Sequence, residues 1–255
     1  MTVAYVGATG ATSGAGTATA SSLTIAFPAG AQAGNVAVLI PQSLSSTVDL
    51  ASVPSGWTYP NGAVDRNGSN GSSWLLLKQL TSADITAGSV TISFNAAQRC
   101  VAEMDVWTGV TGTGVLTATN VDTASNTSEP LPSIANVPAG AVFAWTYAYR
   151  SASAQPDVGL VSGYTQGGQT TATTSPFMTV ENQYKIVSTA GTYGGETGSS
   201  PAAATGVSYA VAIPSSAPPP PPPSHMDVGS VAASALYLGS TTVSAAYVGS
   251  TQVWP

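Results

Sequence analysis

Charged side chains and cysteine are scarce in this sequence of 255 residues. Only 6% of the residues are charged, with eleven acidic against five basic side chains and a formal net charge of −6. So few cations cannot form a basic patch that neutralises phosphates, which argues against nucleic-acid binding. Cys100 is the single cysteine, which excludes an internal disulfide and a cysteine-based metal cluster.

Histidine occurs once, at position 225, directly after a run of prolines. Hydrolysis by a Ser-His-Asp triad and histidine-based metal sites both need a histidine held among suitable partners. Of the residues next to it in the sequence, only Ser224 and Asp227 are of such types. No Walker-type phosphate loop and no dinucleotide glycine fingerprint occurs among the 27 glycines. These absences predict a protein that is not an enzyme and needs no cofactor and no metal.

The first twenty residues lack a basic start and a continuous apolar stretch. A secretory signal or a membrane-spanning helix requires such a stretch. We therefore expect synthesis in a cytoplasm and no membrane insertion.

Short segments that alternate apolar and small polar residues recur from Leu23 onward. Val90, Ile92 and Phe94, for example, share one face of a segment whose other face is Ser and Thr. A period of two is typical of strands with one buried face. Residues 36–40 and 74–77 are instead continuously apolar, which predicts central strands covered on both sides. About ten such segments predict an all-β, β-sandwich or jelly-roll-like domain over residues 1–213.

Two halves of this domain carry similar signals in the same order. Pro28-Ala-Gly30 corresponds to Pro138-Ala-Gly140, and Gly56-Trp-Thr58 to Gly163-Tyr-Thr165. An internal duplication explains this order, and so does the general similarity of strands rich in threonine and alanine. The sequence leaves both explanations open.

A proline-rich linker is predicted at residues 214–224, because it contains six consecutive prolines at 218–223. Proline fixes φ and has no N–H for a strand ladder, so the run adopts polyproline II. At about 3.1 Å per residue it spans roughly 19 Å. This is a semi-rigid spacer between two parts of the chain.

A ten-residue repeat follows in residues 225–255. Gly-Ser pairs recur at 229–230, 239–240 and 249–250, each preceded by Val or Leu, which predicts a short β-hairpin tail with Gly-Ser turns. About thirty residues of hairpins cannot bury enough apolar surface to be stable alone. We expect the tail to anchor the chain to another protein or to form a homo-oligomer. The predicted anchor residues are Leu236, Tyr237, Leu238, Tyr247, Val248, Val253 and Trp254.

Two further features could carry chemistry. Glu103 and Asp105 share one face of a predicted strand with Arg99, and paired carboxylates are what a glycosidase uses. Because the opposite face of that strand is apolar, we expect the pair on the outer surface, as a solvated ion-pair cluster with Arg99.

Phe143, Trp145, Tyr147 and Tyr149 form an aromatic stripe on one face of a second strand. An exposed stripe could stack on sugars, with Trp145, Tyr147 and Tyr149 as glycan contacts. The other face of that strand carries only small residues, which favours the stripe as core.

Several motifs resemble those of known phage proteins. Pro54-Ser-Gly-Trp-Thr58, Trp74-Leu-Leu-Leu-Lys78 and Val106-Trp-Thr-Gly-Val110 resemble a sandwich domain common in tailed-phage structural proteins. The ending Ala246-Tyr-Val-Gly-Ser-Thr-Gln-Val-Trp-Pro255 resembles those of minor tail proteins of actinobacterial phages.

The resemblance implies a non-enzymatic virion structural protein, a minor tail or tail-fibre-like component whose sandwich is displayed and whose C-terminal tail is the anchor. Its partners would be other virion proteins, and its location the tail or the capsid surface of a particle made in a bacterial cytoplasm. The alternatives are a capsid decoration protein and a carbohydrate-binding adhesion module that contacts a host surface glycan.

Overall fold

The computed structural model describes residues 2–13, 19–62, 64–68, 70–156 and 158–216, and four short strands between residues 237 and 254. The chain divides into a compact unit, Met1–Ser216, and a second unit, Ala217–Pro255. Antiparallel sheets build almost all of the described part. The predicted all-β fold is confirmed.

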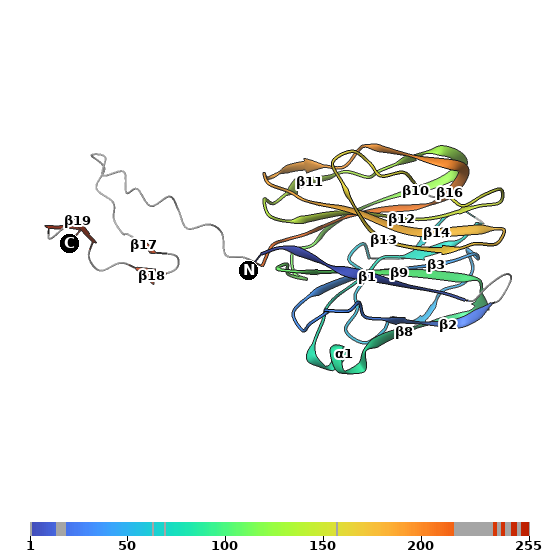
Figure 1. Ribbon diagram of the computed structural model, residues 1–255, viewed down its shortest axis with the longest axis horizontal. Helices are drawn as coiled ribbons and strands as arrows, with labels where there is room; N and C mark the ends of the chain where they lie inside the picture. Colours follow the sequence, from blue (N-terminus) through green and yellow to red (C-terminus); the bar gives the residue numbers. More distant parts are fainter. Residues whose placement is uncertain are drawn as a thin grey trace. The chain divides into compact units, whose positions relative to one another are not determined.

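Two large antiparallel sheets form the middle of the compact unit (Figure 1). The N-terminal large sheet has the order β1 (Ala4–Thr12), β9 (Cys100–Thr108), β3 (Val36–Ser43), β6 (Ser72–Trp74) and β5 (Val64–Arg66), with β7 (Leu76–Gln79) also paired to β3. The C-terminal large sheet has the order β10 (Leu116–Pro130), β16 (Thr197–Ile213), β12 (Val142–Ser151), β14 (Phe177–Ile186) and β13 (Thr165–Ala172).

Two smaller sheets cover the outer faces of the large ones, so the compact unit has four layers (Figure 1). The N-terminal large sheet is covered by β2 (Ala20–Ala26), β8 (Ser89–Gln98) and β4 (Leu50–Ser52). The C-terminal large sheet is covered by β11 (Ile134–Val137) and β15 (Gly191–Tyr193). Three hydrophobic cores lie between the four layers.

Strand β3 shows how the layers follow from the sequence. Its residues alternate between two cores: Val36, Val38 and Ile40 face the central core, while Ala37 and Leu39 face the core under β2 and β8. All eight residues of the strand are buried. The prediction that the apolar run at residues 36–40 is covered on both sides is therefore confirmed.

The two halves of the compact unit share one strand order. In the large sheets, β1-β9-β3 of the first half corresponds to β10-β16-β12 of the second, and β6-β5 corresponds to β14-β13. In the covering sheets, the pair β2-β8 corresponds to β11-β15. The first half has β4 and β7 in addition. The common order of the other strands supports the internal duplication over a chance similarity of strands.

The helix of the described part is α1 (Ser82–Ala87), which joins β7 to β8. It begins with a capping box, in which the Thr81 hydroxyl accepts a hydrogen bond from the Asp84 N–H and the Asp84 carboxylate accepts one from the Thr81 N–H. It ends at Gly88, whose φ of 73° suits glycine. A search of the described residues finds no helix with the length and apolar character needed to span a membrane.

The second unit contains two described strand pairs. β17 (Tyr237–Leu238) pairs with β18 (Thr241–Thr242), and β19 (Ala246–Val248) pairs with β20 (Thr251–Trp254). Residues 217–236 lie outside the described residues, and so do most of the predicted linker and the predicted anchor residue Leu236. The anchoring role of Tyr237, Leu238, Tyr247, Val248, Val253 and Trp254 stays a prediction.

Candidate functional site

The carboxyl pair of Glu103 and Asp105 lies inside the protein, between the two large sheets. Each residue is only 2% exposed, on the face of β9 that also carries Val101 and Trp107 of the central core. The prediction of a solvated outer face was wrong, because the C-terminal large sheet covers that face of β9. The alternation of the sequence identifies two faces of a strand, but not what packs on the second one.

Hydrogen bonds from two other strands satisfy this pair. Asp105 Oδ1 accepts hydrogen bonds from the Tyr5 hydroxyl of β1 at 2.7 Å and from the Gly168 N–H of β13 at 2.8 Å. Glu103 Oε2 accepts one from the hydroxyl of Thr170, also on β13. The two carboxyls therefore connect the N-terminal large sheet to the edge strand of the C-terminal one.

Glycines let the backbone approach the carboxyls closely. A Cβ added to Gly10 of β1 would lie 2.6 Å from Glu103 Oε2, and one added to Gly167 would lie 2.9 Å from Asp105 Oδ1. Cβ atoms in proteins essentially never come closer than 3.0 Å to another heavy atom of this kind. Strands β1 and β13 can thus close over the pair only because these positions have no side chain.

Burial controls the protonation of the pair. Removal from water and, next, the neighbouring Asp105 carboxyl raise the pKa of Glu103 to about 8, although the hydrogen bond from the Thr170 hydroxyl lowers it. Burial also raises the pKa of Asp105, against the hydrogen bonds from Tyr5 and Gly168, which lower it. Because like charges cannot both be buried cheaply, the pair shares protons near neutral pH.

Arg99 does not join this cluster, in contrast to the prediction. Its guanidinium donates to the carbonyl oxygens of Thr174 at 2.8 Å and Ser175 at 3.0 Å. Arg99 thus ties the turn between β8 and β9 to the loop before β14. Arg150 of β12 connects the second half to the first in the same way, because its guanidinium donates a hydrogen bond to the carbonyl oxygen of Asn70 at 3.0 Å.

The buried pair is poorly suited to glycoside hydrolysis. A glycosidase needs both carboxyls in a cleft that a sugar can enter, whereas Glu103 and Asp105 are 2% exposed. A cavity of about 280 Å³ in the compact unit is lined by other residues, among them Gln32, Asn35 and Gln79. The arrangement can hold protons and fasten two sheets together.

The aromatic stripe is also buried. Phe143, Trp145, Tyr147 and Tyr149 are 0% exposed and lie on the outer face of the C-terminal large sheet, in the core under β11 and β15. Glycan contact by Trp145, Tyr147 and Tyr149 is contradicted, since no ring face is open to a sugar. The interpretation of the stripe as core is confirmed.

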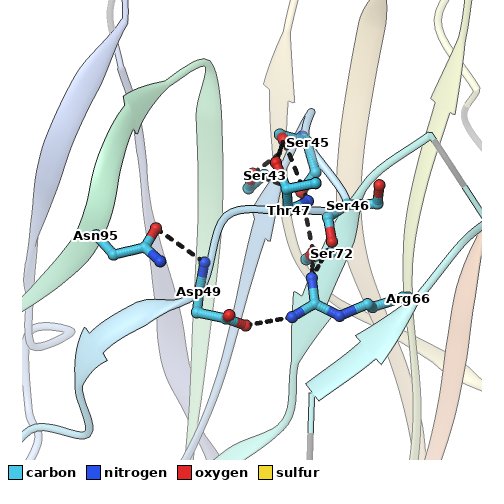
Figure 2. A network of polar contacts seen from close by, with 8 residues as sticks. All are labelled: Ser43, Ser45, Ser46, Thr47, Asp49, Arg66, Ser72 and Asn95. Carbon is cyan, nitrogen blue, oxygen red and sulfur yellow. Dashed lines mark hydrogen bonds and ion pairs between the residues drawn. The ribbon is translucent and has the colours of Figure 1, made fainter.

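A hydrogen-bonded network fastens the loop between β3 and β4 to its neighbours (Figure 2). The Arg66 guanidinium on β5 donates to Asp49 Oδ1 at 2.5 Å, to Ser72 Oγ at 3.0 Å and to the Ser46 carbonyl oxygen. Asn95 Oδ1 on β8 accepts from the Asp49 N–H at 3.1 Å. One planar side chain therefore holds together a loop and two strands at this end of the N-terminal half.

Replacing Arg66 by alanine is expected to lower the free energy of unfolding by about 1 kcal/mol, because exposed ion pairs and hydrogen bonds contribute modestly. Urea unfolding of the purified chain measures this. Asp49→Asn, which removes the charge but keeps an acceptor, should cost less than Arg66→Ala. Equal losses in both variants would mean that the ion pair, and not the fork of hydrogen bonds, holds the loop.

Sequence reasoning missed the partners of the carboxyl pair. Tyr5, Gly168 and Thr170 come from strands that are 100, 63 and 67 residues away from the carboxyl that each contacts. No local pattern marks them. Glu103 and Asp105 themselves were visible, as two carboxylates in an otherwise apolar segment.

Comparisons of the chain with known protein families, with curated proteins and with solved structures find no match.

Proposed function

We propose that the chain is a non-enzymatic structural protein of a bacteriophage particle, of the minor tail or tail-fibre-like kind. The observation that carries the proposal is the division of the chain into a compact unit, Met1–Ser216, and a separate unit, Ala217–Pro255, that bears the ten-residue repeat. A compact module followed by repeats that cannot form a core alone suits a protein that works inside an assembly.

In this proposal the compact unit is the displayed module, a pair of jelly-roll-like sandwiches. Its two halves are tied by the Glu103 and Asp105 hydrogen bonds and by Arg99 and Arg150. Such cross-connections support a module that keeps its shape on a particle surface. The proline-rich segment is the spacer, and the tail forms hairpins that bind other virion proteins or further copies of the chain.

Deletion of the tail tests the anchor. In particles assembled with a chain that ends at Ser216, we expect incorporation to fall at least about tenfold, because the apolar residues of the repeats supply the binding surface. Immunoblotting of gradient-purified particles measures incorporation. Circular dichroism and thermal unfolding of the truncated chain check that the compact unit, with its own three cores, stays folded.

A matched variant distinguishes the anchor from chain length. Tyr237, Tyr247 and Trp254 replaced together by serine should reduce incorporation as the deletion does, whereas a Gly/Ser segment in place of residues 217–223 should not. Wild-type incorporation of the truncated chain would contradict anchoring by the tail. Gold labelling of an epitope after Pro255 locates the protein: gold on the tail supports the proposal, and gold over the head indicates capsid decoration.

A further inference from the structure

Strand β13 lies at the end of the strand order of the C-terminal large sheet and has β14 as its neighbour there. Its register against β14 shifts between Gln166 and Gln169, which interrupts the ladder at Gly167 and Gly168. The Gly168 N–H donates instead to Asp105 Oδ1 of the other large sheet, at 2.8 Å. The middle of β13 is therefore fastened to the carboxyl pair at the point where its own sheet holds it least.

Hydrogen bonds, and not apolar contacts, hold β13 in place. Ala172 is the only apolar side chain of the strand, whose other residues are Thr, Gln and Gly, and so little apolar surface contributes little to stability. The Thr170 hydroxyl donates to Glu103 Oε2. Gln169 Nε2 donates to Glu181 Oε2 on the opposite face of the sheet, at 3.0 Å. Loss of the bonds to the carboxyl pair would leave the strand held mainly by an interrupted ladder.

Strand β1 packs against β13 through small residues. A Cβ on Gly168 would lie 2.5 Å from the Cβ of Ala8, and one on Gly10 would lie 2.6 Å from the Cβ of Thr170. The two backbones therefore approach closely, with small side chains between them. Separating the two strands exposes little apolar surface, so the separation costs little hydrophobic free energy.

The groups that face the carboxyl pair are neutral. Two of them are phenols, Tyr5 of β1 and Tyr184 of β14, and burial, followed by the Asp105 carboxyl, raises the pKa of both hydroxyls. Strand β13 contributes a backbone N–H and the Thr170 hydroxyl, and β3 contributes aliphatic side chains of the central core. The ion pairs of the described part include neither carboxyl of the pair. Negative charge that accumulates on the pair as the pH rises is therefore stabilised only if water enters.

We propose that the carboxyl pair makes β13 a pH-sensitive switch, closed while Glu103 keeps its proton and open once both carboxyls are ionised. In the open state β13 separates from β9 and β1, Glu103 has released its proton to water, and water reaches both carboxylates. Arg99 donates to the carbonyl oxygens of Thr174 and Ser175 in the loop after β13, so this loop stays attached and the strand closes again when the pH falls. The switch does not depend on the virion proposal.

Hydrogen–deuterium exchange of the full chain at pH 6 and pH 8 tests this, with each amide rate divided by its intrinsic rate at that pH. We expect the protection of the β13 amides to fall at least about tenfold between the two pH values, because opening releases a proton that Glu103 retains in the closed state. At pH 8 this protection should also be at least about 100-fold below that of β12 and β16, because only β13 opens. Glutamine cannot ionise, so in Glu103→Gln the fall should shrink to about twofold.

Two further variants separate the pair from other buried groups. Glu181→Gln is the matched control, because Glu181 is bonded from β13 but also accepts hydrogen bonds from Tyr147 and Gln183, and it should leave the fall unchanged. Asp105→Asn is a second variant of the pair in case Glu103→Gln does not fold, and it should reduce the fall because it removes the like charge. Unchanged β13 protection in the wild-type chain, or β13 protection equal to that of β12 at pH 8, would overturn the proposal. A full fall in the pair variants, or loss of the fall in Glu181→Gln, would also overturn it.

Discussion

The free energy of unfolding of the full chain is expected to fall as the pH rises from about 4 to about 8. The cause is the carboxyl pair between the large sheets, where burial raises the pKa of Glu103 from 4.5 to about 8 and raises that of Asp105. Between these pH values the folded chain holds protons that the unfolded chain has released. Raising the pH therefore favours unfolding, and the contribution is fully present only below the unfolded pKa.

The Glu103→Gln variant measures how much of this pH dependence of stability comes from the carboxyl pair. Glutamine keeps the shape of glutamate and an oxygen for the Thr170 hydroxyl, but it cannot ionise. We expect the loss of stability between pH 5 and pH 8 to shrink by on the order of 2 kcal/mol in the variant. Urea unfolding at a series of pH values measures it. Burial also raises the pKa of Glu129 and Glu181, so a residual slope of the same sign remains.

A change of net charge needs its own control. Glu196→Gln removes one negative charge from a side chain that is 37% exposed, and it should not reproduce the effect of Glu103→Gln. If the wild-type chain is equally stable at pH 5 and pH 8, the pair is not held in its protonated form. If both variants reduce the pH dependence of the free energy of unfolding equally, that dependence comes from the total charge and not from the buried pair.

The strands of the compact unit could be predicted because each carries its signal locally. Residues 36–40 and the stripe at Phe143–Tyr149 show period and composition within one segment, and burial follows from them. The stacking of four layers could not be predicted in this way. Whether the second face of a strand meets water or another sheet depends on residues far away in the chain, and for this reason Glu103 and Asp105 were assigned to the wrong environment.

Glu129 shows the same limit at a second place. It lies in a stretch of Ser, Thr and Asn residues in which apolar and polar residues do not alternate. Such a stretch is typical of a polar surface loop. It is nevertheless 0% exposed, in a stretch where β10 shifts its register twice against β16. A register shift depends on the partner strand β16, which is distant in the sequence, so the burial of Glu129 could not be predicted from the residues around it.

Glycine 206 should be among the most sensitive positions of the chain. It is a buried residue of β16, and a Cβ there would overlap the ring of Tyr149 and the carbonyl oxygen of Ala148. The carbonyl belongs to the backbone of the central strand β12 and the ring is packed between Tyr147 and the core, so neither can move without loss of packing. Gly206→Ala is expected to lower the free energy of unfolding by about 3 kcal/mol.

For a chain of this size such a loss lowers Tm by about 6–12 °C, which differential scanning calorimetry resolves. Gly159→Ala is the matched control, because a Cβ there meets no atom within 4 Å and the change should stay within about 0.5 kcal/mol of wild type. A Gly206→Ala chain as stable as wild type would mean that Tyr149 does not lie over β16.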